Sequence, residues 1–148
     1  MLIRANTIIA RNVRRGAHLL EFAIVVPIFF VFVLALVEFG RGLMTSSLVS
    51  NGARVGCRTG VMPGKQNTDV TAAVDNLMQG QGISGYTTAI QVNGQSLDVN
   101  GKPVDVSKAQ SGDTITVQVS VPIASVSWVP SLSFLAGNLN GQFSMPHE

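Results

Sequence analysis

The chain has 148 residues, enough for one domain of ordinary size and an anchoring segment, but not for two such domains. Charged residues make up 12% of it, about half of the ~25% typical of globular proteins, and much of the apolar excess lies in the first forty residues. The formal net charge is +2, yet four of the ten basic residues precede Ala17, and the remainder carries six basic and eight acidic residues. The basic balance therefore belongs to the leader, which argues against nucleic acid as a partner of the remainder.

Residues 1–16 form a short basic leader with no strong helical pattern. Arg11, Arg14 and Arg15 stand just before an apolar segment, and by the positive-inside rule they hold that end of a membrane helix in the cytoplasm. The leader therefore predicts a cytoplasmic N-terminus, with the remainder of the chain outside the inner membrane.

The next feature is an apolar run from Phe22 to Val37, sixteen residues without a charge or a hydrogen-bonding side chain. At about 1.5 Å per residue a helix of this length covers roughly 24 Å, whereas a bilayer core is about 30 Å thick. The span must therefore extend by a few residues at each side, which brings Glu21 and Glu38 to its two ends. We expect a single transmembrane helix over residues 17–40.

A cleaved secretory signal peptide has the same general order, a basic segment followed by an apolar one. The apolar run here is longer than the ordinary core of about 7–15 residues, and no small-residue cleavage site follows it, which disfavours a cleaved signal peptide.

Pro27 removes one backbone hydrogen bond inside the span and predicts a kink, which either is merely tolerated or serves as a hinge.

Beyond the span we expect the helix to continue to about Arg58 and to become amphipathic. Its expected apolar stripe consists of Met44, Leu48, Gly52 and Val55. Gly52, Gly56 and Gly60 recur every four residues and permit another backbone to approach, either from a partner helix or from the local head. The single cysteine, Cys57, is a packed apolar residue, an intermolecular bridge or an exposed reactive thiol.

The remaining residues, 41–148, are expected to form a head with one more helix and a small sheet. The second helix should start near a cap at Thr68 or Asp69 and end near Gln79. Its expected buried face consists of Val70, Ala73, Val74, Leu77 and Met78. Alternating patterns predict strands at 88–92, 96–99, 102–106, 114–121 and 141–145, with Asn-Gly turns at 93–94 and 100–101.

The apolar but aperiodic segment 122–137 contains Trp128, Phe134 and Leu135, which we expect to cover one end of the sheet. The fold class is therefore α+β, with a long transmembrane and amphipathic N-terminal helix packed on a small antiparallel sheet.

Residues that could carry catalysis are scarce. His18 and His147 stand near opposite ends of the chain, and no Cys, His and Asp cluster has the spacing of a metal site. The sequence also lacks a glycine-rich phosphate loop and a nucleophile elbow. We therefore expect no enzyme activity, no cofactor and no metal.

Glu21 is the residue that needs an explanation, because a carboxylate at the centre of a membrane helix costs about 2.5–3.5 kcal/mol and less near an interface. If the bond between Gly16 and Ala17 is hydrolysed, the new amino group lies one helical turn from Glu21 and can also meet Glu21 of a neighbouring subunit. Alternatively, Glu21 lies at the water interface and pairs loosely with Arg14 or Arg15. The residues alone leave both interpretations open.

The segment 15–23, Arg-Gly-Ala-His-Leu-Leu-Glu-Phe-Ala, with Pro27 a few residues on, resembles the N-terminus of TadE-like pseudopilins of the tight-adherence (Tad/Flp) pilus systems. Their pattern is a glycine, four residues, and then Glu-Phe or Glu-Tyr opening an apolar helix. Similar segments follow in order at 38–41, 51–58, 112–117 and 144–148. The departures are Gly52 and Cys57, where alanine is usual, and Pro146, where arginine is usual; none touches the processing motif.

This resemblance implies that a prepilin peptidase, an aspartic membrane protease, cuts between Gly16 and Ala17 on the cytoplasmic side, and that Glu21 and Phe22 serve processing and assembly. It further implies a minor pilin or assembly factor, in the inner membrane or in the filament, with other pilin subunits and the Tad machinery as partners. Adherence and biofilm formation are the expected roles. The alternative is an uncleaved, signal-anchored protein whose head binds an envelope partner.

Overall fold

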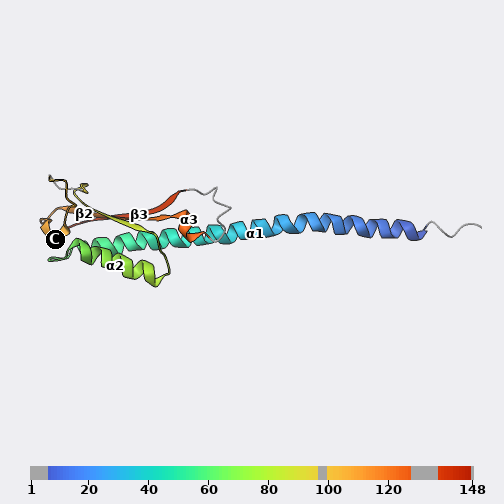
Figure 1. Ribbon diagram of the computed structural model, residues 1–148, viewed down its shortest axis with the longest axis horizontal. Coiled ribbons are helices and arrows are strands. Elements are labelled where there is room, and N and C mark those ends of the chain that lie inside the picture. The colour runs from blue at the N-terminus through green and yellow to red at the C-terminus, as the bar shows by residue number, and fades with distance from the viewer. Residues whose placement is uncertain (1–6, 97–99, 128–136, 148) are drawn as a thin grey trace, which may run out of the picture. The chain divides into compact units, whose positions relative to one another are not determined.

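The computed structural model describes residues 7–96, 100–127 and 137–147, the first eleven of them by backbone alone (Figure 1). Its elements are α1 (Thr7–Gly60), α2 (Asn67–Gly80), β1 (Thr87–Val92), the 3-10 helix η1 (Val106–Lys108), β2 (Thr114–Pro122), α3 (Ile123–Val126) and β3 (Asn138–Pro146). Internal contacts divide the chain into two compact units, Met1–Phe39 and Gly40–Glu148, and α1 runs through both. The predicted α+β class, with a long apolar helix and a small antiparallel sheet, is confirmed.

Helix α1 has 54 residues and contains Pro27 without ending there. In the first unit most of its large apolar side chains from Leu19 to Phe39 are 50–70% exposed, while Val26 and Val33 are half-buried. Within the described ranges, α1 is the one helix long and apolar enough to cross a membrane. The helix begins at Thr7, so the leader from that residue on is helical although its sequence shows no strong helical pattern.

In the second unit the sheet has the order β1-β2-β3, with both pairs antiparallel. The central strand β2 alternates as its sequence predicts. Ile115, Val117, Val119 and Val121 are fully buried. On the opposite face Thr116 and Ser144 share a hydrogen bond of 2.8 Å between their hydroxyls.

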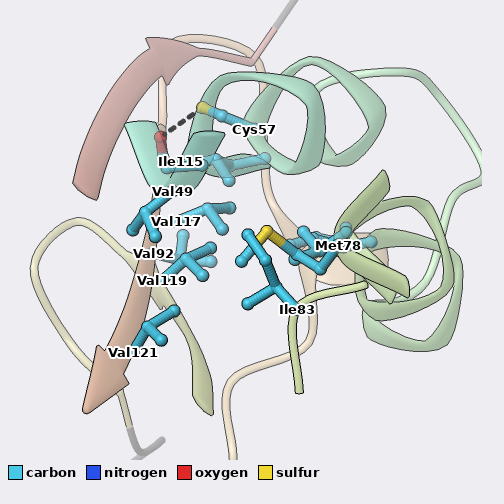
Figure 2. Close-up of a cluster of buried hydrophobic side chains, with 13 residues drawn as sticks. Val49, Cys57, Met78, Ile83, Val92, Ile115, Val117, Val119 and Val121 are labelled. Carbon is cyan, nitrogen blue, oxygen red and sulfur yellow. Dashed lines mark hydrogen bonds between the residues drawn. The ribbon is translucent and has the colours of Figure 1, made fainter. Parts of the chain in front are cut away.

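The hydrophobic core lies between this sheet and the two helices α1 and α2 (Figure 2). Helix α1 contributes Val49, Ala53 and Cys57, and α2 contributes Val70, Val74 and Met78. Three glycines of α1, Gly52, Gly56 and Gly60, make this packing possible. A Cβ on Gly56 would lie 2.8 Å from Val74 Cγ2 and 3.1 Å from Val117 Cγ1. The glycine repeat therefore serves the local head, one of the two uses that the sequence left open.

The predicted stripe on α1 is wrong by about one position. Met44 is 71% exposed, while Leu48 and Val55 are only half-buried. The buried side consists of Thr45, Val49, Gly52, Ala53, Gly56, Cys57 and Gly60. The reason is steric: strand and helix approach α1 so closely that small residues face the core and the long Met44 side chain points outward.

Helix α2 exists as predicted, but its start was misplaced. It is preceded by Gln66 as the N-cap, with no cap at Thr68 or Asp69. The Gln66 backbone N–H donates to the Asp69 carboxylate at 3.0 Å, so the acidic residue acts from the third helical position. Val70, Val74 and Met78 are buried as expected. Ala73 and Leu77 are half-buried.

The strand predicted at 102–106 is not formed, because Val106 begins η1 instead. The side chain of Asn67 in α2 makes the two backbone hydrogen bonds that a neighbouring strand would make with this segment. Its amide N–H donates to Val104 O at 2.6 Å, and its amide oxygen accepts from the Val106 N–H at 3.0 Å. The Asn-Gly turn at 93–94 is present, with φ of 53° and 76°. Strand β1 matches its prediction to one residue, and β3 is present but begins three residues earlier and ends one residue later than predicted. Most of the strand predicted at 96–99 and the residues Trp128, Phe134 and Leu135 lie outside the described residues.

Candidate processing and membrane site

The N-terminal motif is built on consecutive turns of α1. Both the Gly16–Ala17 bond and Glu21 lie in this helix, so the bond is one to two turns from the carboxylate. His18 Nδ1 lies 3.8 Å from Glu21 Oε2, and the two side chains are 82% and 77% exposed. The structure thus brings His18 to Glu21, a pairing that the sequence analysis missed although their spacing of three residues indicates it.

The predicted cleavage bond has a helical backbone in this structure. A protease cleft takes an extended backbone, so cleavage would require local unwinding of α1 around Gly16. Glycine makes that easier, because it is less favourable than alanine in a helix by about 0.5–1 kcal/mol. The side chains of Arg14 and Arg15, the other suggested partners of Glu21, lie outside the described side chains.

Phe22 opens the apolar part of the helix and is 67% exposed. Just beyond it, Val25, Ile28, Phe29 and Phe32 line an open apolar groove along one face of α1. Phe29 and Phe30 pack edge to face with ring centroids 6.2 Å apart. Water does not favour such a surface, since each large apolar side chain gains about 1.5–3 kcal/mol on full burial. The surface suits lipid chains or apolar partner helices.

The second unit places its titratable groups in structural roles. Cys57 is fully buried, and its thiol donates to Ile115 O at 3.2 Å, as Figure 2 shows. Burial raises the pKa of this thiol. The site therefore fits the packed, unreactive interpretation of Cys57, since the thiolate is the reactive form.

Asp113 connects two turns at one end of the sheet by hydrogen bonds. Its carboxylate accepts from Asn93 Nδ2 at 2.8 Å and from the Gln110 N–H at 2.7 Å. These hydrogen bonds lower the pKa of Asp113, with the Asn93 bond contributing most. Among the described residues, 7–96, 100–127 and 137–147, no group of three or more His, Cys, Asp or Glu residues is placed to hold a metal.

Residues 16–58 match the family model of TadE-like proteins. Over this segment the chain is similar to TadE-like proteins. The match begins at Gly16, includes Glu21 and Phe22, and ends at Arg58, close to the C-terminal end of α1. No curated protein and no solved structure matches the chain.

The TadE-like segment is thus confined to α1 and does not reach the sheet. It supports a protein associated with the Tad pilus and, together with the apolar helix, anchored in a membrane. The resemblance seen in the sequence is confirmed for this segment.

Proposed function

We propose that this TadE-like chain is a minor pilin or assembly component of a Tad-type pilus, cut between Gly16 and Ala17 by a prepilin peptidase. The observation that carries the proposal is the extent of the family match, which joins the Gly16–Phe22 motif to the helix that follows it. A single element, α1, holds the motif, the exposed apolar surface and part of the head core. This arrangement suits a subunit that is anchored first and assembled later.

Glu21 would act in assembly. Its carboxylate is exposed where the apolar part of α1 begins, and the apolar side chains that follow are exposed too, so insertion of this part of the helix in a membrane would remove water from Glu21. After cleavage, the amino group of Ala17 supplies a cation one turn away, on the same subunit or on the next. Pairing between subunits would neutralise two charges together and favour entry of the helix into the pilus.

The proposed location follows from the charges around the span. Arg11, Arg14 and Arg15 precede it, so the N-terminus would lie in the cytoplasm and the second unit in the periplasm. The inner membrane is the starting location, and the filament or its basal machinery the destination. The function is structural rather than catalytic, with adherence and biofilm formation as its consequence.

The test is the mature N-terminus, determined by mass spectrometry of protein purified from its native host. We expect the wild-type chain to start at Ala17 and the Gly16→Ala variant to retain residues 1–16. Gly42→Ala is the matched control, because it makes the same replacement in the same helix, far from the bond. A wild-type chain that keeps its leader would contradict the proposal and favour the uncleaved, signal-anchored binding protein.

A second experiment separates processing from assembly. Glu21→Gln keeps the size of the side chain but removes its charge, so no ion pair with the Ala17 amino group can form. We expect this variant to remain in the membrane and to be recovered with pilus subunits much less than the wild type. Equal recovery would show that the Glu21 charge has no part in assembly.

A further inference from the structure

The second unit begins with an exposed apolar surface on α1 that its own core does not use. Leu43 is 57% and Met44 71% exposed. A Cβ placed on the neighbouring Gly40 or Gly42 would meet nothing within 4 Å, so the same part of the helix is open on this side. We propose that Leu43 and Met44 insert into the headgroup layer of the membrane, so that this end of the head rests on lipid.

The first argument is distance along the helix. Glu38 marks the end of the uncharged span, and Leu43 and Met44 follow it by five and six residues, or about 7.5–9 Å of helix rise. A bilayer is about 40–45 Å thick with its headgroups and about 30 Å without them, which leaves roughly 5–8 Å of headgroup layer on each side. Helical side chains lean toward the N-terminus, so Leu43 and Met44 reach back toward the bilayer.

The second argument is the order of residue types on the exposed side of α1. Leu43 and Met44 are followed there by the exposed Ser47 and Asn51, and then by the exposed Arg54 and Arg58. The side thus changes from apolar to small and polar, and then to cationic. This is the order that a helix meets on leaving a membrane, whereas an apolar docking face for a protein would be expected to continue along the helix.

The third argument concerns charge. Arg41 is the one charged residue between Glu38 and Arg54, and it bonds to the head: its Nη2 donates to Val126 O of α3 at 2.9 Å. Arg41 is half-buried, so the charge nearest to Leu43 and Met44 is directed to the head and not to their surface. An apolar surface at this end fits lipid better than water.

This inference depends on anchoring of α1 in the membrane but not on cleavage at Gly16. The test uses the full chain with Cys57→Ala, which leaves single introduced cysteines for a polarity-sensitive fluorophore. The labelled variants are Leu43→Cys, Met44→Cys, Phe30→Cys inside the span and Arg58→Cys near the end of α1. They are reconstituted in phosphatidylcholine–phosphatidylglycerol vesicles and quenched either by lipid carrying a nitroxide near its headgroup or by aqueous iodide.

We expect the lipid quencher to act on Leu43→Cys and Met44→Cys clearly more than on Arg58→Cys, and iodide to show the reverse order. Lipid quenching as strong at Arg58→Cys would mean that the fluorophore drives insertion and would overturn the inference. The inference would also be overturned if only iodide quenched the labels at positions 43 and 44. It would be overturned as well if neither quencher reached these labels because a second protein covered them. Protection of Phe30→Cys from iodide in those cases would show that anchoring holds, and quenching of Phe30→Cys by iodide would show that anchoring itself fails.

Discussion

Gly141 of β3 lies against the backbone of α1 rather than against side chains. A Cβ at this position would come within 2.7 Å of Val49 C and of Ser50 N and Cα. A side chain can rotate away from such a contact, but a helix backbone cannot. The position therefore requires glycine, and it fixes how closely β3 and α1 approach each other.

Gly141→Ala should lower the free energy of unfolding by about 1–3 kcal/mol, the usual cost of overpacking, because strand and helix must move apart. The measurement is urea unfolding of the detergent-solubilised chain, followed by circular dichroism. Gly42→Ala is the control: it fills open space in a helix and should raise the free energy of unfolding by up to about 1 kcal/mol. Equal midpoints for the two variants would refute the close-contact explanation.

Cys57 predicts a dependence of stability on alkaline pH. Burial raises the pKa of its thiol above the ordinary 9.0, so above that pH the unfolded chain releases a proton that the folded chain keeps. The contribution of the Cys57 thiol to the free energy of unfolding should therefore be constant below pH 9.0 and fall as the pH rises further. Urea unfolding between neutral pH and pH 10, compared with Cys57→Ala, measures this. Identical slopes for the two chains would exclude the thiol as the cause.

At the level of elements, the sequence predicted the regular patterns well and the close contacts poorly. Strand β2 was predicted correctly because apolar and polar residues alternate strictly along it, so only one of its two faces can be buried. The predicted position of the stripe on α1 was wrong because the prediction followed hydrophobicity. Met44 is more hydrophobic than the small residues near Val49, which are the ones that the structure buries. Which residue faces a tightly packed neighbour depends on the neighbour, and local hydrophobicity does not contain that information.

The prediction of a strand at 102–106 was wrong for a related reason. Its alternation resembles that of a strand, but Pro103 has no N–H to give to a ladder. Asn67, far away in sequence, binds Val104 and Val106 instead. A long-range contact of one side chain with a backbone leaves no signal in the local pattern.

Asn67→Ala should therefore release this segment. The variant leaves the Val106 N–H and Val104 carbonyl without their partner, at a cost of about 1–3 kcal/mol in the free energy of unfolding. Hydrogen exchange should accelerate at Val106 while the core strand β2 stays protected. Thr68→Ala, next in the same helix and exposed, should leave both properties unchanged. Unaltered exchange at Val106 in Asn67→Ala would count against this role of the amide.

For the whole molecule, the sequence singled out Glu21 by its charge at the edge of a long apolar run and Phe22 by the family resemblance, and their roles stay predictions. The structure adds the contact of His18 with Glu21, which follows from their spacing of three residues on a helix. It also adds the helical backbone at Gly16, which depends on α1 beginning as early as Thr7.

The apolar surface of α1 predicts that one charge inside it will prevent membrane anchoring. Phe30→Lys places an ammonium group in the middle of the span, at a cost of about 2.5–3.5 kcal/mol for insertion. We expect this variant to be removed from membranes by alkaline carbonate, while the wild type and Asn51→Lys, changed at an exposed polar position of α1, remain. Retention of Phe30→Lys would place the anchor elsewhere.

The continuity of α1 also has a mechanical meaning. A pull on this helix at Gly40 does not enter the head through a loop that can stretch, because the same helix carries Val49, Ala53 and Cys57 into the core. The load is instead shared as shear by the packing of α1 against α2 and the sheet, where Gly141 contacts the helix backbone. Such a joint resists sliding until many contacts fail together.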